Sequence, residues 1–194
     1  PRLSSAASDV YKRQGLLSNQ KFILQSLISI LFILLASHSN LINPLIIISN
    51  DWTIDTNIMI YPICFLTLVG MSNAVNLTDG LDGLASGCSS IVFVGVGTEI
   101  FIQGQKELLI YGLISYAMAG ICIGFLKFNK YPAKIFMGDT GSLTIGATLG
   151  TITILTNSFF TLFIISGIFI IETLSVIIQV GFFKITKTFF KNGR

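Results

Sequence analysis

The sequence predicts an all-α fold, a polytopic membrane helix bundle with about six transmembrane helices. Of the 194 residues, 52% are hydrophobic and only 11% are charged, whereas soluble domains carry about 25% charged residues. The mean hydropathy is +0.80. The net charge of +3 comes from bases at the ends of apolar runs, where bases set membrane topology. We therefore expect the lipid bilayer as surroundings and no nucleic-acid partner.

The polar stretch at the start of the chain is expected to lie outside this bundle. Residues 1–14, PRLSSAASDVYKRQ, are rich in small residues and show no helical periodicity. They also lack the apolar core of a signal peptide. We interpret residues 1–14 as a non-native leader and residues 15–194 as a partial transmembrane domain.

Six apolar segments are long enough to be read as membrane crossings with a window of about 19 residues. They are Lys21–Ser37, Ile58–Val75, Leu84–Ile102, Leu108–Phe128, Ser142–Leu155 and Phe159–Phe183. The loop between the first two is long and nearly uncharged. There we expect a short re-entrant or interfacial piece at Leu45–Ile48, with Trp52 as an interface anchor.

The positions of the bases orient the bundle. If Lys21 starts on the cytoplasmic side, the bases after the fourth and sixth segments return to that side, and Lys106 is the one base in the outer loops. This distribution agrees with the positive-inside rule. Asp79, Asp82 and Asp139 then all face the cytoplasm.

A polar stretch, Asn73–Gly87, lies between two strongly apolar runs. A carboxylate at a membrane helix centre costs roughly 2.5 to 3.5 kcal/mol, so something must stabilise those of Asp79 and Asp82. Their i, i+3 spacing puts them on one face if the segment is helical, and two like charges that close favour a divalent cation, a Lys partner or one raised pKa. The alternative is a helix start with Thr78 or Asp79 as N-cap. On residue chemistry both interpretations stay open.

The second polar stretch, Phe128–Ser142, follows the fourth segment. Pro132 ends the preceding helix, Lys130 and Lys134 offer cations, and Asp139 lies where the fifth segment begins. A helix N-terminus suits phosphate, and a carboxylate there suits a metal ion that bridges to that phosphate. The alternative is an N-cap Asp with snorkelling lysines. Because both polar stretches lie on one side of the membrane, a shared site is favoured over two separate caps.

Two further acids and three cysteines lie in apolar segments. Glu99 is near the outer end of the third segment, where an interfacial location explains it. Glu172 is inside the sixth, and an inter-helix hydrogen bond and a site role both stay open. Cys64, Cys88 and Cys122 are odd in number and are interpreted as small buried hydrophobic residues.

Three ordered motifs carry a family resemblance. They read NAVNLTDGLDGLASG at 73–87, NKYPAKIFMGDTGSLTIG at 129–146 and ETLSVIIQVGFFK at 172–184. In these motifs the chain closely resembles phospho-N-acetylmuramoyl-pentapeptide transferase, a family of the polyprenyl-phosphate N-acetylhexosamine-1-phosphate transferase superfamily. The resemblance covers residues 15–191.

The resemblance implies a reaction. A family member transfers phospho-N-acetylmuramoyl-pentapeptide from UDP-MurNAc-pentapeptide to undecaprenyl phosphate, with Mg²⁺, giving lipid I and UMP for peptidoglycan synthesis. It implies the bacterial inner (cytoplasmic) membrane, an active site that faces the cytoplasm, and a homodimer. The implied catalytic residues are Asp79, Asp82 and Asp139. Asp139 would bind the metal with Asn76 nearby, and the substrate-binding residues would be Asn76, Gly80, Leu81, Asp82, Asn129 and Phe136.

The sequence also departs from the family. The Asp-Asp-x-x-Lys motif before the helix that begins near Lys21 is not matched, and neither is the His-rich loop after the sixth segment. We therefore expect an internal fragment that is inactive alone. Two alternatives remain: a sister transferase for another UDP-N-acetylhexosamine, and a non-enzymatic membrane transporter. The transporter predicts acids distributed across the membrane depth, whereas here Asp79, Asp82 and Asp139 gather on one side and only Glu172 is deep.

Overall fold

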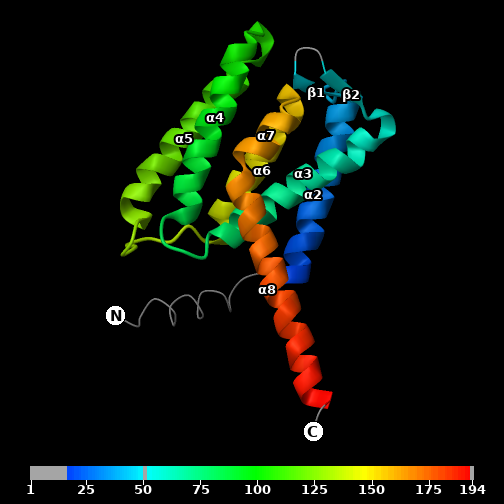
Figure 1. Ribbon diagram of the computed structural model, residues 1–194. Helices are drawn as coiled ribbons and strands as arrows, with labels where there is room; N and C mark the ends of the chain where they lie inside the picture. The colour runs from blue at the N-terminus through cyan, green and yellow to red at the C-terminus, as the bar shows by residue number, and fades with distance from the viewer. Residues whose placement is uncertain (1–16, 50–51, 193–194) are drawn as a thin grey trace.

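The structure is a computed structural model that describes residues 17–49 and 52–192. The predicted leader, residues 1–14, lies outside the described residues. Helices dominate the fold, and a single two-stranded hairpin accompanies them in the described part (Figure 1). The longer helices are α2 (Ser18–His38), α3 (Ile60–Thr78), α4 (Leu84–Gln103), α5 (Leu109–Asn129), α6 (Gly138–Thr156) and α8 (Gly167–Asn192).

The predicted all-α membrane bundle is confirmed, but the predicted number of about six crossings was too high. Among the described residues four helices are long and apolar enough to span a bilayer, namely α2, α3, α4 and α5 with their short 3-10 extensions. A bent helix pair brings the number to five. The predicted crossing Ser142–Leu155 lies in α6, which is 19 residues long but carries many Thr and Gly residues, so it falls outside this set.

The predicted crossing Phe159–Phe183 is broken in two. The short helix α7 (Phe159–Ile165) meets α8 at an angle of 65°. The break lies at Ser166 and Gly167, and sharp bends of helices commonly occur at such Ser/Gly pairs. Ser166 is buried, and Phe169 beyond it is fully buried, so the bend points an aromatic side chain into the core. Beyond the bend, α8 extends past the other helices (Figure 1).

The piece at Leu45–Ile48, expected to be re-entrant or interfacial, is a β-strand. β1 (Leu45–Ser49) pairs antiparallel with β2 (Trp52–Asp55), and Leu45 is opposite Asp55. The β-branched run at 46–48 favours extended backbone over a helix. Trp52 is 70% exposed, as a side chain at a membrane interface would be.

Two glycines set how closely α3 and α6 approach each other. A Cβ built on Gly146 would lie 2.3 Å from the Met71 carbonyl oxygen and 2.5 Å from the Ser72 Cα. A Cβ on Gly150 would lie 3.2 Å from the Leu68 Cα. Small residues four apart let membrane helices pack backbone to backbone. The α3–α6 crossing therefore depends on glycine at position 146.

The connections fall at two opposite ends of the bundle (Figure 1). We call one the site end; it holds the α3–α4 loop (79–83), the α5–α6 loop (130–137) and the first turns of α2 and α6. We call the other the hairpin end; it holds β1, β2 and the start of α7. The two polar stretches of the sequence thus lie at the same end, as predicted.

Candidate functional site

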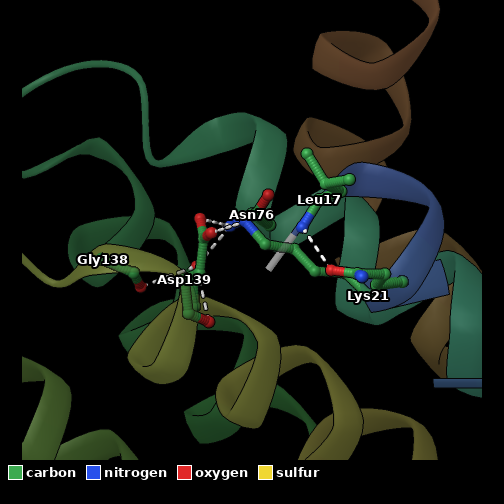
Figure 2. A network of polar contacts seen from close by, with 7 residues as sticks. Leu17, Lys21, Asn76, Gly138 and Asp139 are labelled. Carbon is green, nitrogen blue, oxygen red and sulfur yellow. Dashed lines mark hydrogen bonds and ion pairs between the residues drawn. The ribbon is translucent and has the colours of Figure 1, made fainter. Parts of the chain in front are cut away.

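The main polar cluster at the site end gathers around Asp139 in the first turn of α6. The Asn76 amide nitrogen donates to Asp139 Oδ1 at 3.0 Å and to Ser142 Oγ at 2.8 Å. The Lys21 ammonium forms an ion pair with Asp139 Oδ2. Figure 2 shows Lys21 and Asn76 reaching Asp139 from separate helices. Side chains from α2, α3 and α6 therefore converge on one carboxylate.

The glycine-dependent crossing explains this convergence. Ser142 is one helical turn before Gly146 on α6, and Asn76 is one turn after Ser72 on α3. Because Gly146 lies directly on Ser72, the next turns of the two helices meet, and residues four apart share a helix face. The backbone contact at Gly146 thus sets the distance between Asn76 and Asp139.

Positive charge and a hydrogen-bond donor surround the Asp139 carboxylate. Asp139 lies in the first turn of α6, where the helix dipole stabilises negative charge. The Lys21 ammonium and the Asn76 amide add a charge and a hydrogen bond in the same direction. The Lys21 and Asp139 side chains remain 31% and 45% exposed. A ligand can therefore reach both charges.

The first polar loop is not the helical segment that the spacing suggested. Residues 79–83 form turns between α3 and α4, so Asp79 and Asp82 do not share one helical face. Asp79 is the C-cap of α3. The Thr78 hydroxyl donates to the Ala74 carbonyl oxygen within α3. The N-cap alternative for Thr78 and Asp79 is therefore wrong, and the residue at the N-cap of α4 is Gly83, with φ of +79°.

The N-cap alternative for Asp139 is also wrong. Met137 occupies the N-cap position of α6 and makes no side-chain cap hydrogen bond. Asp139 lies inside the first turn, and its carboxylate binds side chains of α2 and α3. The Asp139 carboxylate thus joins α6 to α2 and α3.

The two polar loops contact each other through Asp82 and Asn129. Asp82 Oδ2 accepts a hydrogen bond from the Ala133 backbone N–H at 3.0 Å. Asn129, at the end of α5, accepts one from the Gly83 N–H at 3.1 Å. The residues predicted for substrate binding at these loops differ in accessibility: Leu81 and Phe136 are 69% and 62% exposed, whereas Asn129 is buried.

The side chains that could bind a cation at the site end are few among the described residues. The described part of the chain has no group of three or more His, Cys, Asp or Glu residues that could hold a metal ion, so Asp79, Asp82 and Asp139 do not form one. Asn76 directs its amide nitrogen to Asp139, which leaves only its oxygen for a cation. Mg²⁺ is commonly held by one or two carboxylates together with substrate phosphates. Asp139 fits that mode.

Sequence reasoning missed three polar side chains of the site end: Lys21, Ser142 and Ser86. Lys21 was expected only to mark the start of the first crossing, yet it pairs with Asp139. Ser142 accepts from Asn76, and Ser86 donates to Asn129 Oδ1 at 3.1 Å. The GATLG run at 146–150 is the signal that could have found Ser142, because two glycines four apart predict a close helix partner.

The other singled-out residues lie away from this cluster. Glu99 accepts hydrogen bonds from Ser158 and Gln103 near the hairpin end. Glu172 is half-buried on α8, and the choice between its two roles stays open. Cys64 and Cys122 are buried free cysteines, as predicted, and Cys88 is half-buried.

Comparison with known proteins assigns the family. The model of glycosyl transferase family 4 matches residues 4–157. The chain is 78% identical over 183 residues to a phospho-N-acetylmuramoyl-pentapeptide-transferase of Prochlorococcus marinus subsp. pastoris, covering 94% of this chain and 51% of that protein. It is 79% identical to the protein of the same name from strain MIT 9515, covering 94% and 50%.

A more distant relative bears the same name. The protein from Prochlorococcus marinus strain NATL2A is 50% identical over 173 residues, covering 89% of this chain and 46% of the relative. The chain thus spans about half the length of the curated relatives it matches. Since the family model covers well over half of this chain, the chain belongs to glycosyl transferase family 4.

Proposed function

We propose that this chain supplies the catalytic end of a phospho-N-acetylmuramoyl-pentapeptide transferase of peptidoglycan synthesis. The reaction would move phospho-MurNAc-pentapeptide from UDP-MurNAc-pentapeptide to undecaprenyl phosphate and release UMP and lipid I. The observation that carries this proposal is the accessible Lys21–Asp139–Asn76 cluster at the first turn of α6. The name shared by its relatives, up to 79% identical, supports the same assignment.

The cluster suits a pyrophosphate substrate. Phosphoryl transfer depends mainly on positioning and on neutralising the charge of the phosphate oxygens. The Lys21 ammonium and the positive end of the α6 helix dipole would do so here. Lys21 is 31% exposed, so its ammonium can leave Asp139 and bind a phosphate oxygen.

A magnesium ion completes the proposed chemistry. Asp139 would hold it, with the Asn76 amide keeping the carboxylate oriented and the substrate phosphates supplying further ligands. When bound, the ion would neutralise the charge that develops on the pyrophosphate. Asp79 and Asp82 would act from the neighbouring loop as the other catalytic carboxylates.

The exposed side chains around the cluster would bind the nucleoside. Leu81 and Phe136 present apolar surface at the site end, and Phe136 would stack on uracil. A Cβ built on Gly80 would have only the Leu77 carbonyl oxygen nearby, at 3.7 Å, so a ligand can approach the Gly80 backbone. Asp82 would border the same pocket, and the buried Asn129 would support it through the two loops that it joins.

The apolar helices and the positions of the bases support a membrane setting. The chain is a multi-pass membrane protein, with four or five helices able to span a bilayer in its described part. We propose the bacterial inner membrane, with the site end in the cytoplasm, because the bases gather at that end. The lipid acceptor would then arrive from the bilayer and the nucleotide from the cytoplasm. A homodimer is proposed from the family resemblance alone.

A hybrid protein tests this function. Because the chain spans about half of its relatives, its matched residues are placed in the corresponding half of the strain MIT 9515 protein; we call this the hybrid transferase. Membranes with the hybrid are given UDP-MurNAc-pentapeptide, undecaprenyl phosphate and Mg²⁺. We expect UMP release that depends on both substrates and stops when EDTA removes the metal.

One further substrate, and the dependence of turnover on metal, distinguish the alternatives. Turnover with UDP-N-acetylglucosamine but not with the muramoyl substrate would assign the chain to a sister transferase. UMP release that persists in EDTA would contradict the metal role of Asp139. Failure of the hybrid with every nucleotide sugar, while the intact relative is active, would overturn the proposed function for this chain.

A further inference from the structure

A buried group of hydrogen bonds joins the two polar loops of the site end. We call it the Asn129 node: Asn129, Gly83, Ser86 and Ile135. Asn129 Oδ1 accepts from the Gly83 N–H at 3.1 Å and from Ser86 Oγ at 3.1 Å. The Asn129 amide nitrogen donates to the Ile135 carbonyl oxygen at 3.0 Å. One side chain thus binds the start of α4 and the loop that leads to Asp139.

The backbones at this node are in direct contact. A Cβ built on Gly83 would lie 3.3 Å from the Lys130 Cα and 3.1 Å from Leu126 Cδ1. The positive φ of Gly83, +79°, is also one that favours glycine. The α3–α4 loop therefore lies against the α5–α6 loop with less space than a Cβ usually has at this point.

The polar groups of the node are buried. Asn129 is 2% exposed and Ser86 is 0% exposed. A buried donor or acceptor that loses its partner costs more than the hydrogen bond itself contributed, so loss of Asn129 would disturb both loops at once. Ser86 Oγ also lies 3.3 Å from the Gly83 carbonyl oxygen, so its single proton is shared between that oxygen and Asn129 Oδ1.

We propose that Ser86 and Asn129 are positioning residues for the nucleotide side of the site. They hold the loops of Leu81 and Phe136 in a single relative arrangement before substrate binds. This inference rests on the proposed function, in which those exposed side chains contact the nucleoside. Ser86 is fully buried, so it acts through Asn129 and does not touch the substrate.

Substitution of Ser86 in the hybrid transferase tests this role. Ser86→Ala removes one of the two donors to Asn129 Oδ1 and adds no atom. We expect the KM for UDP-MurNAc-pentapeptide to rise about tenfold, which is the change that the free energy of one lost hydrogen bond produces. We expect kcat to change less than about twofold. Asn129→Leu, which removes all three node contacts of the side chain, should raise KM further.

Ser90→Ala is the matched control. Ser90 lies one turn further along α4 and is buried, but its hydroxyl donates only to the Gly87 carbonyl oxygen of its own helix among the described residues. We expect its KM and kcat to match those of the unsubstituted hybrid. If the effect came only from losing a buried hydroxyl on α4, Ser86→Ala and Ser90→Ala would show it equally. Such an effect would lower the amount of active enzyme without raising KM.

Hydrogen exchange provides a second measurement that needs no turnover. In substrate-free hybrid, Ser86→Ala and Asn129→Leu should speed amide exchange in peptides covering 79–87 and 130–138, and Ser90→Ala should not. Unchanged exchange, or faster exchange with an unchanged KM, would overturn the positioning role while the proposed function stands. Loss of UMP release in the unsubstituted hybrid would instead count against the proposed function itself.

Discussion

Two carboxylates at opposite ends of the bundle show how similar residues are put to different use. At the hairpin end, Glu99 on α4 accepts from Ser158 at 2.7 Å and from Gln103. At the site end, Asp139 on α6 is bound by the Lys21 ammonium and the Asn76 amide. Both carboxylates join elements that are distant in sequence. The difference is that Asp139 has a cation among its partners.

The partners decide what each carboxylate can do. Ser158 is buried, and its hydroxyl also accepts from Thr156 at 3.0 Å, so Glu99 is held in a network of neutral donors. Such a network stabilises the packing of α4 against α7 and leaves little for a ligand to bind. Asp139 instead lies 45% exposed at a helix N-terminus beside a partly exposed ammonium, where an anionic substrate and a cation can both bind. An acid in a membrane segment is therefore a site candidate when its partner is charged and accessible.

Asp139→Asn should produce the largest effect. In the hybrid transferase the substitution removes the negative charge proposed to hold Mg²⁺ but keeps the size of the side chain. We expect UMP release to fall by about 10² to 10³, as for loss of one key electrostatic group in an active site. The measurement is the initial rate at saturating substrates over a range of Mg²⁺ concentrations. Undiminished Mg²⁺-dependent turnover would exclude Asp139 as an essential ligand.

Lys21→Met removes the cation that distinguishes the two carboxylates. Methionine keeps the length of the apolar stem, so the loss is mainly that of the charge. We expect kcat/KM to fall by roughly 10- to 100-fold, the range of a hydrogen bond to a charged group of about 1.5 to 3 kcal/mol. Lys106→Met is the matched control, because Lys106 lies in the α4–α5 connection, away from the site end. Equal losses in both variants would show that Lys21 has no specific role.

Gly146→Ala tests whether the helix crossing sets the geometry around Asp139. The added Cβ would overlap the backbone of Met71 and Ser72, so α3 and α6 must separate. We expect a loss of about 1–3 kcal/mol in the free energy of unfolding, typical of overpacking. Gly120→Ala on α5 is the matched control, since its Cβ would meet nothing within 4 Å and alanine favours a helix by up to about 1 kcal/mol. Thermal unfolding of the purified chain in detergent compares the two; a Gly146→Ala protein as stable as Gly120→Ala would show that the crossing can adapt.

The sequence predicted the ends of most helices but not how they touch. Apolar length located α2 to α5, because a bilayer fixes the length of a crossing. The break at Ser166 was missed because the apolar run continues unchanged through it. The strand at Leu45–Ser49 was missed because a short apolar run has no periodicity that separates strand from helix.

Only part of the site could be predicted, because the sequence shows local composition but not how distant helices pack. The polar loops were found from their composition, and their common end follows from counting crossings. The pairing of Lys21 with Asp139, 118 positions apart, depends on how α2 and α6 each pack on α3, which no local pattern contains. Only Gly146 and Gly150 of α6 carried a trace of that packing, because a glycine on a helix surface marks where another backbone can approach.

Glu99→Gln should have the smallest effect and so sharpens the comparison with Asp139→Asn. The amide is the same size as the carboxylate and its oxygen can still accept from Ser158, so one charge-assisted pair becomes a neutral one. We expect the free energy of unfolding to fall by about 0.5–1.5 kcal/mol and UMP release by the hybrid transferase to change less than about twofold. Thermal unfolding and initial rates measured on the same preparation separate the two quantities. A Glu99→Gln loss of turnover as deep as that of Asp139→Asn would mean that the hairpin end takes part in the reaction, and the distinction between a packing carboxylate and a reactive one would have to be abandoned.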